Sequence, residues 1–285
     1  MMKYLISIFS IILISSCNED ILPEPKCALV IEGWIEDGGF PIVMVSQTIP
    51  ISSNYNNLDS IGDFIVKWAT VKVSDGEQTV NLTGKYAPKY FPPYIYTTSK
   101  MRGECGKTYK LTVEYADYYA VAHTTIPNNP PMVYYEVKQC SDSDTLYMIR
   151  ARFKDVLAEK NYYQFFVKVG ANEKQFYASY LGTIDDIILN GVTEMTVYRG
   201  HNIENKDYTP YFTSADSVAV KFATLDVDSY LFWDDYLKNQ SLSGNMFLTG
   251  AKNIRSNILG GYGCWCGYGV DIKYISIGDS VSNNI

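Results

Sequence analysis

Apolar and polar residues alternate along much of the chain after residue 27, which is the pattern of strands that bury one face. The clearest case is residues 107–127, where a strand, a turn and a returning strand predict a hairpin. A second hairpin is predicted around Asp75-Gly76, a pair that favours a tight turn. Short strands joined by turns at regular intervals predict a β-sandwich over residues 27–127.

A proline-rich stretch separates two parts of the chain. Residues 126–131 contain three prolines, which break hydrogen-bond ladders and stiffen a linker. Strand-like segments start again beyond this stretch. We therefore predict a second, β-rich domain over residues 131–285.

One helix is predicted near the end of the second domain. Tyr230, Trp233 and Leu237 fall at helical spacing on one face, and Asp226 or Asp228 can cap the start. An amphipathic helix of this kind packs on a sheet. The predicted fold class is therefore mainly β, with one or two short helices in the second domain.

The N-terminus reads as an export signal. Residues 4–14 are mostly apolar, which is too short for a membrane span of about 20 residues but suits the core of a signal peptide. Two serines then precede Cys17, and this sequence resembles a bacterial lipobox, in which the cysteine is lipidated and the chain is cut before it. We predict a lipoprotein signal peptide over residues 1–16 and a lipidated tether over residues 17–26. The alternative is an ordinary signal peptide with an incidental cysteine.

The balance of charge is acidic. The net charge is −7, which argues against binding to nucleic acid or to anionic lipid headgroups, so acyl chains would supply the attachment to the outer membrane. Glu19 and Asp20 resemble the signal that sends Bacteroidota lipoproteins to the outer face of that membrane; a plain polar tether is the alternative. We expect a lipid-anchored, cell-surface protein.

The remaining five cysteines allow several pairings, because the export route permits disulfides. A bridge between Cys27 and Cys105 could staple the first domain. Cys264 and Cys266 point to one face of a strand, where a bond between them would strain the chain. Either could pair with Cys140, so the connectivity of these three stays open. Four close ligands for zinc are missing from the pattern, and we expect neither a metal nor a cofactor.

Signals of catalysis are weak. His123 lies in a predicted strand and His201 in a polar loop, and no nucleophile motif such as G-x-S-x-G is present. The acidic pairs at residues 185–186 and 234–235 do not face each other as a glycosidase pair must. The glycine-rich residues 260–269 precede no helix, so close backbone packing explains them better than a phosphate site. We predict no catalytic residue and a non-enzymatic protein.

An aromatic, proline-rich segment is the best candidate for ligand contact. Tyr90 and Phe91 lie among three prolines, which would hold the loop in shape, and aromatic rings give a large contact area. We predict both as contacts for a peptide or a glycan. The alternative for their neighbours Tyr94 and Tyr96 is that they occupy a strand.

Four short motifs suggest modification. Each joins an aspartate, a hydroxyl residue and an apolar residue, and resembles the O-glycosylation sites of Bacteroidota. The predicted sites are Ser60, Thr145, Ser217 and Ser280.

Three segments together resemble a known family. In order they are CALVIEGWIEDGGFPIVMVSQTIPI, GECGKTYKLTVEY and SYLFWDDYLKNQSLSGNMFLTGAKNIRSNILGGYGCWCGYG. They are similar to the Bacteroidota outer-membrane lipoproteins grouped as domain of unknown function 4249. The resemblance implies an N-terminal immunoglobulin-like β-sandwich, and a non-enzymatic accessory or ligand-binding subunit of a TonB-dependent nutrient transporter of the starch-utilisation type. An adhesion or surface-assembly module is the alternative, and the family supplies no catalytic residues.

Overall fold

The protein is mainly β, as the sequence predicted. A computed structural model describes residues 27–48, 62–155, 160–170, 173, 175–185, 191–200, 208–242 and 253–282. Within these ranges the chain forms three sheets and two α-helices, α2 (Val227–Leu242) and α3 (Ile277–Ser282). The described part holds no helix with the length and apolar character that crossing a membrane requires.

The three sheets have the following strand orders. The largest is β12 (Tyr177–Asp185), β11 (Tyr162–Val169), β15 (Ser217–Leu225), β16 (Gly261–Ser276), β1 (Leu29–Glu36), β2 (Ile42–Gln47), β6 (Tyr94–Thr97) and β5 (Thr83–Tyr86). The second is β4 (Thr79–Asn81), β3 (Thr70–Ser74), β7 (Thr108–Tyr115) and β8 (Tyr118–Thr125). The third is β13 (Val192–Val197), β10 (Leu146–Lys154) and β14 (Phe212–Thr213), with β9 (Val133–Gln139) also paired to β10.

The N-terminal half is a sandwich of two sheets. Alternate residues of β1, among them Leu29, Ile31 and Ile35, are buried. They pack in one core with Tyr109 and Leu111 of β7. Both predicted hairpins are present, as β3–β4 and β7–β8. The alternation read from the sequence therefore places the correct face of each strand in the core.

The C-terminal half has its own core between the sheet that contains β10 and the strands β11 and β15. Phe153 of β10 packs against Phe222 of β15 with ring centroids 4.8 Å apart, and Phe222 stacks on Phe165 of β11 at 4.4 Å. All three rings are buried. This packing directs the opposite face of β9, β10 and β13 outward.

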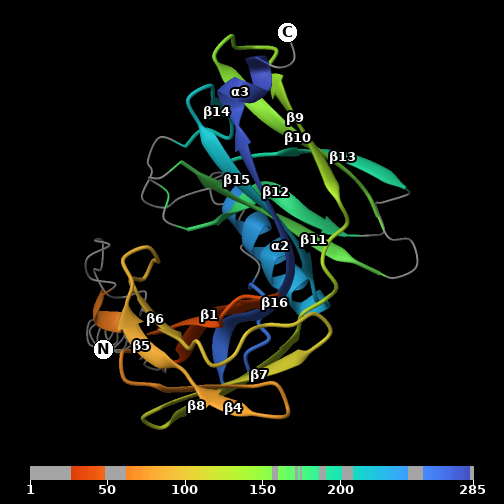
Figure 1. Ribbon diagram of the computed structural model, residues 1–285. Helices are drawn as coiled ribbons and strands as arrows, with labels where there is room; N and C mark the ends of the chain where they lie inside the picture. Colours follow the sequence, from red (N-terminus) through yellow and green to blue (C-terminus); the bar gives the residue numbers. More distant parts are fainter. Residues whose placement is uncertain are drawn as a thin grey trace, which may run out of the picture.

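Strand β16 joins the two halves, as Figure 1 shows by its run from the lower sandwich into the upper one. Its first half pairs in parallel with β1, from Leu29↔Gly261 to Glu36↔Tyr268. From Tyr268 to its end at Ser276, β16 pairs antiparallel with β15. The largest sheet therefore continues from the N-terminal half into the C-terminal half, although the predicted linker separates these halves in the sequence. The N-terminal sandwich contains a strand from the far end of the chain.

Trp265 of β16 anchors this arrangement. Its side chain is fully buried in the N-terminal core, and its indole Nε1 donates a hydrogen bond to the Tyr109 carbonyl oxygen at 3.0 Å. A large aromatic side chain is among the strongest contributors to a core. The C-terminal strand therefore fills the centre of the N-terminal sandwich.

The glycines of β16 let the linker cross it closely. A Cβ added at Gly267 would lie 2.8 Å from the Thr125 carbonyl oxygen, and one at Gly269 would lie 2.6 Å from the Asn128 carbonyl oxygen. Real Cβ atoms do not approach backbone this closely. Close backbone packing, the role predicted for this glycine-rich stretch, is confirmed.

Helix α2 is capped by Asp226, one of the two residues predicted for that position. The Asp226 Oδ1 atom accepts a hydrogen bond from the Ser229 amide at 2.8 Å, which satisfies a free donor of the first turn. Its Oδ2 atom accepts from the Thr124 hydroxyl at 2.5 Å and from the Thr125 amide at 3.2 Å. The cap therefore also ties the helix to β8.

Candidate functional site

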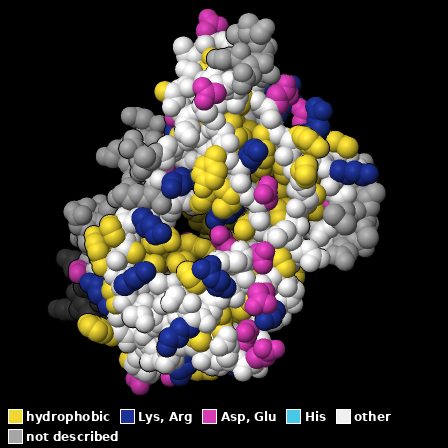
Figure 2. Space-filling view, viewed as in Figure 1, with side chains coloured by type: hydrophobic (Ala, Val, Ile, Leu, Met, Phe, Trp, Pro, Cys, Tyr) yellow, Lys and Arg dark blue, Asp and Glu magenta, His cyan; other side chains and the backbone are white. Residues whose placement is uncertain are grey.

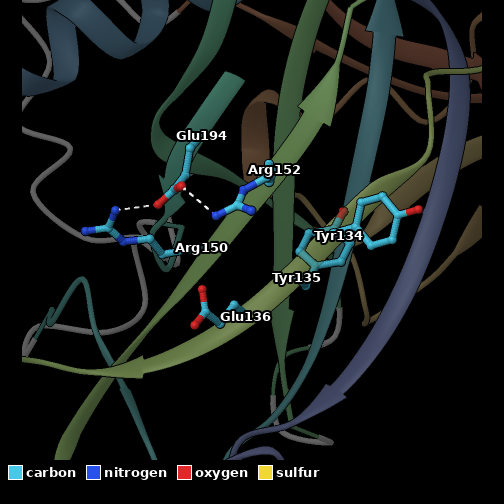
Figure 3. Close-up of a pocket in the computed structure, with 6 residues that line it drawn as sticks. All are labelled: Tyr134, Tyr135, Glu136, Arg150, Arg152 and Glu194. Atoms are coloured by element: carbon cyan, nitrogen blue, oxygen red, sulfur yellow. Dashed lines mark hydrogen bonds and ion pairs between the residues drawn. The ribbon is translucent and has the colours of Figure 1, made fainter. Parts of the chain in front are cut away.

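An open pocket of about 410 Å³ lies on the outer face of the sheet formed by β9, β10 and β13 (Figure 3). Strand alternation creates it, because Ile149, Ala151 and Phe153 of β10 are buried in the core and the residues between them point outward. Six residues line the pocket: Tyr134, Tyr135, Glu136, Arg150, Arg152 and Glu194.

The strand register brings the charged residues together. Arg152 pairs with Tyr134 of β9 on one side and with Glu194 of β13 on the other. Arg150 pairs with Glu136. Donors and acceptors of hydrogen bonds therefore alternate across three neighbouring strands.

Glu194 holds both arginines. Its Oε1 atom lies 2.6 Å from Arg150 Nη1 and its Oε2 atom 3.1 Å from Arg152 Nη2. Figure 3 shows the two guanidinium groups on either side of the carboxylate. The hydrogen bond from Arg150, followed by that from Arg152, holds the pKa of the Glu194 carboxyl below its usual value. Glu194 therefore remains an ionised acceptor at neutral pH.

The tyrosines complete the lining. Tyr134 is 70 % exposed. The Tyr135 side chain instead packs against the core behind the sheet, and its buried hydroxyl has no hydrogen-bond partner among the described residues. The same holds for the Arg150 Nε atom. An unpaired buried donor is disfavoured by about 1–3 kcal/mol. The surfaces of this pocket that a ligand can reach are therefore the exposed Tyr134 side chain and the charged groups beside it.

The predicted contact residues lie elsewhere, beside the outer face of the N-terminal sheet. Tyr90 is half-buried, with its ring centroid 6.0 Å from that of Trp34 on β1, and Phe91 is half-buried next to it. The alternative offered for Tyr94 and Tyr96 is confirmed, because both lie in β6. A contact role for Tyr90 and Phe91 stays a prediction.

Glu32 stands on this same face of β1. In the strand register it pairs with Met44 of β2 and with Cys264 of β16. The Glu32 residue is exposed, but the protein atoms around its carboxyl partly desolvate that group, which raises its pKa to about 7. Figure 2 shows hydrophobic side chains gathered around a hollow between the two halves, with acidic and basic side chains both scattered over the view.

Glu32 should make stability depend on pH. A raised pKa means that the folded state holds the proton more tightly between pH 4.5 and about 7, so the free energy of unfolding falls as pH rises through this range. Contact with solvent makes the fall smaller than for a fully enclosed carboxyl. In Glu32→Gln the fall should be shallower, as measured by urea unfolding at a series of pH values. An unchanged pH profile in the variant would contradict this assignment.

The predicted modification sites are spread over the surface. Cys17 and Ser60 lie outside the described residues. Thr145 and Ser217 are exposed, whereas Ser280 is half-buried and its hydroxyl donates to the Ser276 carbonyl oxygen at 2.7 Å. Lipidation and O-glycosylation at these positions stay predictions.

The proposed bridge between Cys27 and Cys105 is absent, and both are free thiols. Cys27 lies just before β1, whereas the Cys105 amide donates to Asp37 at the other end of β1. The strand separates the two cysteines by roughly 30 Å, against the 4.4–6.8 Å between Cα atoms that a disulfide allows. The prediction was wrong because two cysteines that each stand next to a strand of one domain can still lie at opposite ends of its sheet.

The acidic pair on α2 is engaged in ion pairs. Asp234 pairs with Lys238 at 2.7 Å, and the buried Asp235 accepts from Arg255 at 2.5 and 2.8 Å. His123 lies exposed on β8, while His201 is outside the described residues. Among the residues that the structure describes, no group of three or more His, Cys, Asp or Glu side chains could hold a metal ion.

Sequence reasoning did not find the pocket. Its signal was present in the segment YMIRARF, where Arg150 and Arg152 alternate with apolar residues and must share the outer face. The partner Glu194 comes from a strand more than forty residues away, with a contact of sequence separation 44. Only the register of β13 against β10 brings the three together.

Comparison with known proteins finds one family. A family model described as "Domain of unknown function (DUF4249)" matches residues 18–273. None of the curated proteins matches the chain.

Proposed function

The chain belongs to the DUF4249 family, and from this membership, the leader and the pocket we propose that it is a non-enzymatic, cell-surface lipoprotein of the outer membrane. It binds an oligomeric nutrient and serves as an accessory subunit of a TonB-dependent transporter. Acyl chains on Cys17 hold it to the membrane. The observation that carries the binding role is the pocket of Figure 3.

The chemistry of the pocket favours an oligosaccharide. Each sugar hydroxyl both donates and accepts a hydrogen bond, which matches the alternation of Arg150, Arg152, Glu136 and Glu194 on neighbouring strands. The exposed Tyr134 ring offers a flat apolar surface beside these groups. A few polar groups around an aromatic surface are the usual composition of a small-molecule site.

The same chemistry argues against hydrolysis by this pocket. A carboxylate pair that cleaves a glycosidic bond needs one acid with a raised pKa, which can donate a proton at neutral pH. The arginines instead lower the pKa of Glu194. The other acid, Glu136, pairs with Lys138 at 3.1 Å. Both carboxylates suit the role of hydrogen-bond acceptors for a bound ligand.

Tyr134→Ala should weaken ligand binding about ten-fold, because tyrosines are enriched among the few interface residues whose truncation costs more than about 1 kcal/mol. Isothermal titration with linear glucan, mannan and xylan oligosaccharides measures this, with casein peptides as the competing class. The matched control is Tyr274→Ala on β16, whose side chain is 76 % exposed on another sheet. Equal affinity in the two variants, or binding of the peptides alone, would remove the proposal.

The transporter role has a separate test. Purification of the native lipoprotein in mild detergent should recover a TonB-dependent barrel with it, and Cys17→Ser should be lost from the membrane fraction. Repeated recovery of the lipoprotein alone counts against the accessory role. Recovery with fimbrial components would support the alternative of a surface-assembly module.

A further inference from the structure

Two cysteines of β16 lie in abnormally close contact. The Cys264 and Cys266 sulfur atoms are 2.8 Å apart, and both side chains are buried. Non-bonded heavy atoms settle about 3.5–4.0 Å apart, whereas a disulfide bond measures about 2.05 Å. Both are free thiols in the structure, yet the sulfurs lie closer than those of two separate thiols usually do.

The strand register explains why the sulfurs meet. Cys264 pairs with Glu32 and Cys266 with Trp34 on β1, so both side chains project from one face of β16. Two residues of an extended strand place the Cα atoms about 6.4–6.8 Å apart. This separation is at the upper end of the range that disulfides adopt. Bond formation therefore requires the sulfur atoms to close from 2.8 Å to about 2.05 Å, with the local strain in β16 that the spacing predicts.

Among the described residues the two thiols lie in mostly apolar surroundings, where the Tyr268 hydroxyl also contacts Cys266. They pack in an apolar cluster with Phe166, Tyr268 and Trp233, the last of which comes from α2. Figure 1 shows that helix lying beside β16. Burial, and then the contact with Cys266, raises the pKa of the Cys264 thiol, so no thiolate is stabilised there. In the described part of the chain no metal-ligand group includes either sulfur.

We propose that Cys264 and Cys266 form a disulfide within β16 in the exported protein. Each thiol loses its hydrogen, and the two protons and two electrons pass to the disulfide of a thiol oxidoreductase in the cell envelope, which becomes a dithiol. The location rests on the proposed export, because that compartment keeps disulfides oxidised. The closed loop is very short, so the bond adds little loop-closure stabilisation. Its effect is to remove two buried thiols and fix the strand beneath α2.

Peptide mapping of the full-length protein from native membranes tests the bond. The protein is unfolded in the presence of iodoacetamide, without reductant, and digested with trypsin. Cleavage after Arg255 and Lys273 gives a peptide of residues 256–273 whose only cysteines are this pair. The mass of this peptide should show no alkyl group and should be two hydrogen atoms below that of the dithiol form. When the protein is reduced before alkylation, the peptide should carry two alkyl groups. Two alkyl groups without reduction would overturn the proposal.

A matched variant separates this bond from a pairing with Cys140. In Cys140→Ser the peptide of residues 256–273 should keep its internal disulfide and carry no alkyl group. Alkylation of its cysteines in this variant would show that Cys140 had been the partner. If the leader proves to be retained, the purified protein is equilibrated with a glutathione redox buffer. Formation of the internal bond there upholds the proposal without export, and persistent alkylation of both thiols overturns it.

Discussion

A fragment that ends at residue 131 should fail to fold, although it contains every strand of the N-terminal sandwich that precedes the linker. In the complete chain β1 lies between β2 and β16. The fragment loses the whole parallel ladder from Leu29↔Gly261 to Glu36↔Tyr268. It also loses Trp265 from its core. The lost tryptophan alone corresponds to about 3–5 kcal/mol, against a total stability of about 5–15 kcal/mol for a domain.

Amide NMR spectra measure this outcome directly. The fragment of residues 27–131 should give the narrow dispersion of an unfolded chain. Addition of a separate peptide of residues 256–276, which supplies β16, should restore dispersed signals. A well-dispersed spectrum and cooperative unfolding of the fragment alone would show that the N-terminal sandwich does not depend on the C-terminal strand.

Trp265→Ala in the complete chain should lower the free energy of unfolding by about 3–5 kcal/mol. The side chain is fully buried, and its loss leaves a cavity in the N-terminal core. It also removes the indole donor from the Tyr109 carbonyl oxygen, which adds the penalty of an unsatisfied buried acceptor. Urea unfolding followed by circular dichroism gives the change.

Tyr262→Ala is the matched control for this substitution. It truncates another aromatic residue on the same strand, but its side chain is 59 % exposed. Surface substitutions of this kind usually change stability by less than about 0.5 kcal/mol. Similar losses in the two variants would mean that Trp265 does not anchor the core.

Local patterns in the sequence predicted the elements that local interactions determine. The hairpin of β7 and β8 follows from alternation and a short turn, and the helical spacing around Trp233 predicted α2. The strands with which β16 pairs could not be predicted from local patterns. Its parallel partner β1 lies more than two hundred residues earlier, and only the three-dimensional fold brings Gly261 next to Leu29.

The candidate site shows the same division between local and long-range information. Alternation in β10 was sufficient to place Arg150 and Arg152 on an outer face, but their shared partner Glu194 depends on the register of β13. The aromatic composition of the loop was the basis for predicting Tyr90 as a ligand contact. Composition identifies aromatic residues but does not show what their rings contact. The structure places that ring against Trp34.

Calorimetric unfolding of the mature chain tests most directly whether β16 makes the two halves one unit. Because the largest sheet runs through both cores, they should melt together in one transition, with equal calorimetric and van't Hoff enthalpies. Two separate heat-absorption peaks, in which one half unfolds at a lower temperature and the other half stays folded, would contradict a shared strand.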